Sequence, residues 1–298
     1  WIGVTRVCGN ELEVTVLARD TWTLLPSVGA SRTGGENKTN TGLSDPNFLG
    51  SGKSVGISHK KDADRSETSV DFDDPNVLGS HWQAGLSYDK RSDGRGRSAY
   101  LERPFYSELA EWRFGLSGED DVREQSRYVG AEAIADYRQD REFASVDVGW
   151  RLAERNGRQL RLLAGFRYDA REFERLPDEP NLDLLPEDRT LSYPWIGFDY
   201  RENRFREMTN LTRLQRVEDV RDGFEWRTEL GYSSPGIGAT EDRAVLNIDF
   251  RDALLVSDSD YASYGLSHSG TWRFDQARFE NLIETLNLEY FHGGSVDW

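Results

Sequence analysis

Residues 146–152 (Val-Asp-Val-Gly-Trp-Arg-Leu) alternate an apolar residue with a charged residue or glycine. The same alternation runs through 160–169 and 224–232. A period of two over about ten residues is typical of a strand with one apolar and one polar face. Such strands, repeated along a chain that has no long apolar run, favour an all-β fold, an antiparallel transmembrane β-barrel.

The composition agrees with a barrel better than with a soluble enzyme. Hydrophobic residues make up 37% of the 298 residues and charged residues 30%, whereas the apolar content of soluble globular domains approaches half. A barrel with a polar lumen needs an apolar side chain at only every second strand position. Aromatic residues at 12% fit aromatic girdles at two membrane interfaces and argue against disorder.

The net charge of −16 argues against a nucleic-acid partner, which requires a basic face. Cys8 is the single cysteine, so no internal disulfide is possible. The four histidines are scattered, and we expect neither a metal site nor a cofactor. Adjacent acids abound but are usually solvated, and no nucleophile-elbow motif is present, so we do not expect an enzyme.

Strand-like segments follow one another along most of the chain. A short alternating strand at 11–17 precedes them and is expected to end a separate small domain (1–20), with the barrel over 21–298. Residues 120–142 leave two interpretations open, a strand or a loop. We expect barrel strands at 22–33, 40–49, 53–62, 67–78, 82–90, 97–106, 111–119, 143–153, 159–172, 190–201, 205–214, 223–233, 243–254, 262–274 and 282–292.

The connections fall into two kinds. Short turns are expected at 50–52, 79–81 and 156–157, and longer charged loops at 60–67, 90–97 and 174–189. Short turns at one end and long loops at the other are typical of an outer-membrane barrel.

The polar phase of the strands predicts which charges face the lumen. Cross-strand pairs among these charges would rigidify the wall, and the alternative is that they gate or select a conducted solute. Glycines recur in the same phase, which indicates a crowded lumen or bends needed for closure; chance is the other explanation. The candidate lumen charges are Arg151, Arg161, Arg167, Glu225, Arg227 and Glu229.

One six-residue motif occurs twice, 29 residues apart: Asp45-Pro46-Asn47-Phe48-Leu49-Gly50 and Asp74-Pro75-Asn76-Val77-Leu78-Gly79. Proline has no backbone N–H for a sheet ladder, so each motif is expected to end a strand. Asn and Gly are expected to supply the turn that follows.

These motifs carry a resemblance to a known family. Residues 14–106 resemble the start of the barrel in the BamA/TamA-type outer-membrane assembly and translocation family, also called the bacterial surface antigen family. The family's Arg-Gly-(Phe/Tyr) motif is not matched; residues 220–224 come nearest, with Asp222 intruding, so we expect the motif beyond Trp298 in a longer protein. The matching segments are 20–24, 42–50, 52–56, 64–65, 73–79, 92–94 and 103–106.

The resemblance implies a barrel of roughly 16 strands, of which this chain would hold about 12–15, preceded by the end of a POTRA-like domain. It implies an integral protein of the outer membrane of a Gram-negative bacterium that inserts or translocates other proteins. Its partners would be the lipid bilayer, unfolded β-barrel or secreted clients, and periplasmic or lipoprotein components.

In that family the first barrel strand is an edge, or lateral gate, that opens and templates an incoming strand. Pro26 removes one ladder donor, so we expect a poorly closed edge here. Two other functions stay open: a passive transport pore, and a soluble binding protein with its sheets packed face to face. The matching edge residues are Trp22, Thr23, Leu24, Leu25, Pro26, Val28, Ala30 and Arg32.

Overall fold

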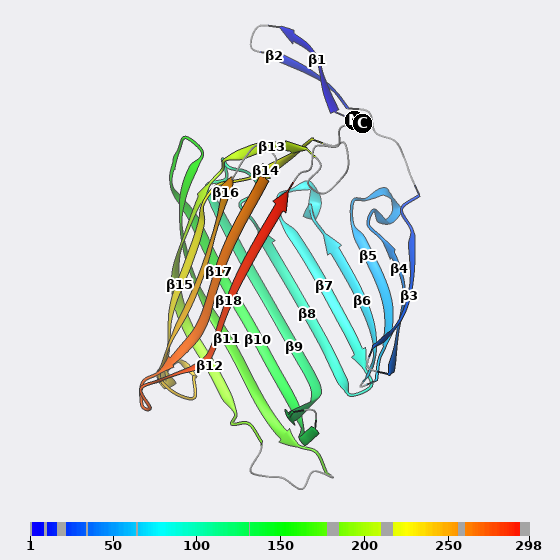
Figure 1. The fold of residues 1–298 in the computed structure, drawn as a ribbon, viewed down its shortest axis with the longest axis vertical. Coiled ribbons are helices and arrows are strands. Elements are labelled where there is room, and N and C mark those ends of the chain that lie inside the picture. The colour runs from blue at the N-terminus through cyan, green and yellow to red at the C-terminus, as the bar shows by residue number, and fades with distance from the viewer. Residues whose placement is uncertain are drawn as a thin grey trace.

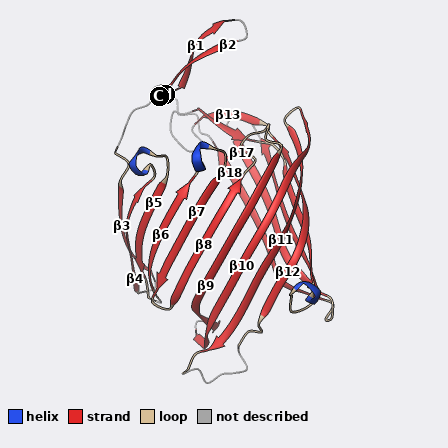
Figure 2. Cartoon of the chain, turned by 180° about the vertical axis from the view of Figure 1, so that it is seen from behind, coloured by secondary structure: helices blue, strands red, loops and turns tan. Residues whose placement is uncertain are grey.

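The computed structural model describes residues 2–8, 11–16, 22–33, 35–63, 65–130, 132–177, 185–209, 217–255 and 260–292. Their dominant feature is one antiparallel sheet of 14 strands, in the order β18-β17-β16-β15-β12-β11-β10-β9-β8-β7-β6-β5-β4-β3. Chain neighbours are sheet neighbours throughout, except that the β13–β14 hairpin interrupts the step from β12 to β15. The sheet is strongly curled, with β16–β18 and β7–β9 on opposite walls (Figures 1 and 2).

The strand bounds define the wall. They are β3 (Leu25–Thr33), β4 (Glu36–Asp45), β5 (Ser54–Lys61), β6 (Ser66–Asp74), β7 (Gln83–Arg91), β8 (Gly94–Arg103), β9 (Trp112–Val129), β10 (Glu132–Arg155), β11 (Arg158–Arg175), β12 (Arg189–Glu202), β15 (Glu225–Ser233), β16 (Arg243–Leu255), β17 (Asp260–Arg273) and β18 (Arg278–His292). Within the described ranges β3 and β18 are not paired with each other, so the sheet is not closed. Its 14 strands agree with the expected 12–15.

Three sequence expectations have different outcomes. Residues 120–129 and 132–142 belong to two long strands, β9 and β10, which confirms the strand interpretation for these residues. The strand expected at 205–214 is present as β13 (Phe205–Thr209), but its expected place in the wall is wrong. It pairs with β14 (Val217–Arg221) in a separate sheet, and 210–214 lie outside the described residues. The strand at 11–17 has an unexpected partner, since β1 (Ile2–Cys8) pairs with β2 (Glu11–Val16).

The apolar period is absent from the lower part of the β9–β10 hairpin because both of its faces are polar. The phase that is apolar at 146–152 of β10 is occupied further down by residues such as Arg138 and Asp140. On the opposite, polar face, Arg141 of β10 contacts Glu119 of β9 at 3.1 Å and Asp169 of β11 at 3.2 Å. Cross-strand ion pairs on that face hold this segment together.

The two kinds of connection do lie at opposite ends of the sheet. The end of the sheet that is uppermost in Figure 1, here called the upper end, carries the turns at 50–52, 79–81 and 156–157. The opposite, lower end carries the connections for which long loops were expected. The expected lengths hold for the short turn at 156–157 and for the long connection between β11 and β12, but the long loop expected at 90–97 is wrong. β7 and β8 are separated only by residues 92–93, because the charged residues around them continue the strands.

Alternate residues face opposite sides, and the two sides differ in burial. On the polar face Arg161 of β11 and Asp199 of β12 are 7% and 4% exposed. On the apolar face Ile196 of β12 and Trp226 of β15 are 48% and 46% exposed. A soluble protein buries its apolar side chains, so the distribution here is inverted. Crowding on the inside of a curled sheet explains why the polar face is the buried one.

Candidate functional site

The repeated motifs form two equivalent turns at the upper end. β4 and β6 end at Asp45 and Asp74, directly before the prolines, as predicted. Asp45 Oδ1 accepts a hydrogen bond from the Asn47 N–H (3.0 Å), and the second motif repeats this bond. Asn and Gly supply the turn, as predicted: Asn47 Oδ1 accepts from the Gly52 N–H (2.7 Å), and Gly50 is left-handed (φ 71°). The left-handed Leu49 (φ 53°) is a further turn residue that the sequence did not indicate.

The expected first-strand edge lies at one end of the sheet. Strand β3 begins at Leu25, and Trp22, Thr23 and Leu24 precede it. Within the described residues its only partner is β4. Val28, on the apolar face, is 85% exposed. The remaining candidates, Pro26, Ala30 and Arg32, share that face and pair with Leu43, Thr39 and Asn37.

The candidate lumen charges all lie on the polar face, and the structure brings several of them together. Glu229 of β15 accepts from Arg227 at 2.5 Å and lies 3.6 Å from Arg167 of β11. Arg161 reaches Asp199 of β12 at 4.0 Å. Sequence reasoning missed Asp199 as a partner, because strand register was needed to place it opposite Arg161.

Two candidates have other partners. Glu225 pairs with Arg221 at the base of the β13–β14 hairpin. Arg151 Nη1 donates to the backbone oxygen of Glu108 (2.6 Å), and Gln159 Nε2 donates to the same atom (3.1 Å). These bonds hold the β8–β9 loop, residues 104–111, against the polar face.

Phe105 of this loop packs on an apolar cluster that lies unexpectedly on the polar face. Its ring is 4.3 Å from the Arg161 guanidinium carbon, a distance typical of a cation–π contact. The cluster therefore links the upper loop to β11, β12 and β16. Its buried members are Leu163, Leu191, Tyr193, Trp195 and Val245.

Glycines in the polar phase leave room for large neighbours. A Cβ at Gly165 would lie 2.8 Å from Trp195 Cε2, and one at Gly231 would lie 2.5 Å from Tyr193 Cδ2. A Cβ at Gly149 would lie 2.7 Å from Leu163 Cδ2. Three explanations for the recurring glycines were considered: crowding on the polar face, bends for closure, and chance. This close packing supports crowding.

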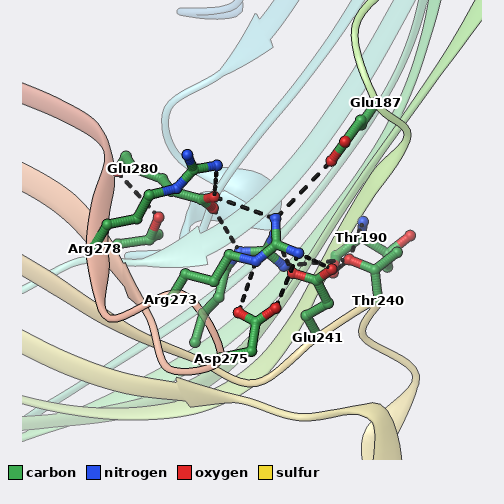
Figure 3. A network of polar contacts seen from close by, with 10 residues as sticks. Glu187, Thr190, Thr240, Glu241, Arg273, Asp275, Arg278 and Glu280 are labelled. Carbon is green, nitrogen blue, oxygen red and sulfur yellow. Dashed lines mark hydrogen bonds and ion pairs between the residues drawn. The ribbon is translucent and has the colours of Figure 1, made fainter.

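At the lower end, Arg273 of β17 lies at the centre of a polar network (Figure 3). Its guanidinium contacts Asp275 at 2.8 Å and Glu280 at 3.4 Å, and it also pairs with Glu241. The hydrogen bond from Arg273 holds the pKa of Asp275, in the β17–β18 turn, below its usual value. The network ties the β15–β16 loop to β17 and β18.

Aromatic side chains on the apolar face gather near the upper end. The ring centroids of Tyr200 and Phe224 lie 5.7 Å apart, those of Phe224 and Phe250 5.2 Å, and those of Phe250 and Tyr264 5.5 Å. The four residues form a continuous row across β12 to β17.

A second group of aromatic residues lies near the lower end. Tyr232 packs on Phe274 with centroids 6.0 Å apart, and Trp272 packs on Phe279 at 4.8 Å. At roughly 3.3 Å a residue, Tyr264 and Trp272 of β17 are about 26 Å apart along the strand. The apolar face is thus bordered by aromatic residues at both ends.

A cavity of about 570 Å³ opens on the polar face in the upper half of β12 and β15–β18; we call it the β16 cavity. Charged residues from β12, β15 and β16 line one side, and Ser263, Gly265 and Ser267 of β17 leave space on the other. Asp249 and Arg251 of β16 project from its wall. Sequence reasoning did not single them out, although the alternation over 243–254 assigns them to the polar phase.

Comparison with known proteins does not assign this chain to a family: no family model matches it, and no curated protein matches it.

Across the described ranges, none of the helices has the length and apolar character needed to cross a bilayer. The same ranges contain no group of three His, Cys, Asp or Glu side chains arranged to hold a metal ion. The fold and site define an all-β protein whose single large sheet exposes its apolar face.

Proposed function

We propose that this sheet is most of the wall of an outer-membrane β-barrel of a Gram-negative bacterium. Its apolar face contacts lipid, its polar face lines the lumen, and the protein inserts or translocates other outer-membrane or secreted proteins without enzymatic chemistry. The β1–β2 hairpin ends a preceding POTRA-like domain, and further strands complete a wall of roughly 16. Periplasmic or lipoprotein partners act with it.

The observation that carries the membrane part is the exposed apolar face. Described residues of the chain do not cover Ile196, Trp226 or Val28, and a contiguous face of this size requires an apolar environment. For strands tilted by about 40°, 26 Å along β17 corresponds to a height of roughly 20 Å, which is of the same order as the roughly 25 Å apolar band of known barrels with its aromatic borders. The soluble alternative requires a second sheet packed on this face, and the described strands provide none.

The edge position of β3 supports the assembly role. An unpaired strand edge presents backbone N–H and C=O groups to another chain, and β-augmentation by an incoming strand uses such groups. A passive pore is less well supported, because the β8–β9 loop lies against the polar face through Phe105, and Arg161 and Arg167 there are engaged by Asp199 and Glu229.

Membrane residence is tested by extraction. We expect the protein to stay in the membrane pellet in alkaline carbonate and to enter solution in detergent. Brominated lipids should quench Trp226, which is exposed, more than Trp195, which is buried on the polar face; single-Trp variants separate the two signals. Release by carbonate, or equal quenching, would contradict the membrane proposal.

The edge role is tested by cross-linking in a Cys8→Ser background. Val28→Cys on β3 should form disulfides with cysteines placed in the terminal strand of a client barrel during assembly. The matched control is Thr41→Cys, which pairs with Val28 in register but lies on the interior strand β4. Equal cross-linking at both positions would mean that client contact is not a property of the edge.

A further inference from the structure

The β16 cavity exists because small and long side chains meet on the polar face. β17 presents Ser263, Gly265 and Ser267 toward it, whereas β16 presents Asp249 and Arg251. In the sheet register Gly265 lies opposite Arg251 and Ser267 opposite Asp249. The long side chains of β16 therefore extend over open space rather than against another side chain.

Most charged side chains that line the cavity form an ion pair or a hydrogen bond with another described residue, and two do not. Arg201 binds Asp199 at 2.8 Å, Arg227 binds Glu229, and Ser263 donates to Glu289 at 3.0 Å. Asp249 and Arg251 make no ion pair or hydrogen bond with any described residue, although their register partners on β15 are Arg227 and Glu225. Those two partners are engaged elsewhere, by Glu229 and by Arg221.

Asp249 and Arg251 are two residues apart on one strand, so their side chains leave the same face about 6.6 Å apart. An extended peptide carries residues i and i+2 on one face at the same spacing. If residues i and i+2 of the peptide are acidic and basic, they can pair with Arg251 and Asp249. The side-chain amide of Asn287, which also lines the cavity, can bond to polar groups of the peptide between these two residues. A neutral sugar carries no charges that could pair with Asp249 and Arg251.

We propose that the β16 cavity binds an extended polypeptide segment that carries an acidic and a basic side chain two residues apart. This inference rests on the proposed function, because it identifies the polar face of a client strand as the ligand. Lumen-facing residues of barrel strands are polar at every second position, so such segments are common in clients of this class.

The test uses the purified full chain in detergent, with a photo-cross-linking phenylalanine derivative at position 267 in place of Ser267. The probe is the peptide Thr-Glu-Thr-Lys-Thr. The control peptide Thr-Glu-Lys-Thr-Thr has the same composition, but its charges lie on opposite faces. The control site is Ser269, which is on the same face of β17, donates to Asn247 and does not line the cavity.

We expect labelling by the first peptide at position 267, with about tenfold less labelling in the Asp249→Asn, Arg251→Gln double variant, corresponding to roughly 1.4 kcal/mol. Near-ultraviolet circular dichroism checks that the variant folds. Equal labelling by both peptides, or equal labelling at positions 267 and 269, overturns the proposal. Displacement of the peptide by maltohexaose also overturns it, because the ligand is then a carbohydrate.

The outcome is separable from that of the proposed function. Carbonate extraction and the Val28 cross-link report membrane residence and the β3 edge, and neither requires the β16 cavity. If both of those succeed while position 267 is not labelled, the cavity proposal alone is wrong.

Discussion

Trp195 of β12 lies directly across Gly165 of β11, so close that a methyl group at position 165 would lie 2.8 Å from Trp195 Cε2 and 2.5 Å from the backbone oxygen of Val146. The two residues are register partners on the polar face. The indole thus takes the space that a side chain at position 165 would fill, and Trp195 belongs to the buried cluster that Phe105 joins.

Gly165→Ala should destabilise the fold by about 1–3 kcal/mol, because neither the indole nor the strand backbone can move without loss of packing. Gly118→Ala is the control, since the nearest atom to its added methyl lies 3.7 Å away. Urea unfolding in detergent micelles or lipid vesicles measures both. Similar free energies of unfolding for the two variants would show that the Trp195 contact does not constrain position 165.

Leu78→Gly should stabilise the protein by up to about 1 kcal/mol. Leu78 has φ 53° and is 99% exposed, so the substitution relieves a left-handed conformation without removing packing. Leu109→Gly, at an exposed loop position outside the left-handed region, should instead cost about 0.5–1 kcal/mol. A lower midpoint of urea unfolding for Leu78→Gly would indicate that this side chain contacts something outside the chain.

Asp222→Ala should loosen the β13–β14 hairpin. Asp222 is 3% exposed and binds Arg204 at 3.0 Å and Arg206 at 3.4 Å. Hydrogen bonds to a charged group contribute about 1.5–3 kcal/mol, so trypsin should cleave the variant faster between Arg204 and Arg221. Asp219→Asn, at an exposed position of the same hairpin, should leave the cleavage rate unchanged. Equal rates for both variants would contradict the role of Asp222.

The link between Arg273 and Asp275 should make stability depend on pH in the acid range. The folded-state pKa of Asp275 is lowered below 3.8 by the Arg273 hydrogen bond. A lowered pKa stabilises the folded state above the unfolded pKa, and the contribution is lost as the pH falls through the folded value. The stability difference between wild type and Asp275→Asn should therefore be present at neutral pH and shrink below pH 3.8. A difference that does not change with pH would contradict the link.

Much of the wall follows from local pattern. The alternation at 146–152 predicts a strand, and the structure contains it within β10. The strand ends at Asp45 and Asp74 follow from the prolines after them. These features depend on one strand at a time, because a backbone with a period of two needs only its own sequence to separate two faces.

Other features depend on several strands at once. Asp199 meets Arg161 only through the β11–β12 register, and Phe105 reaches the buried cluster only because the loop folds back. β13 leaves the sheet although its sequence resembles a strand of the wall. The polar β9–β10 extension is held by ion pairs across three strands, Arg141 with Glu119 and with Asp169, which only the strand register brings together.

The chain's own residues thus set which positions can form strands and which phase of each strand is polar, since side-chain alternation is local. Register, the curl of the sheet and the partners of each charge arise only when all 14 strands pair. They depend on contacts between residues far apart in the sequence, and the ion pair of Arg167 on β11 with Glu229 on β15 is one result.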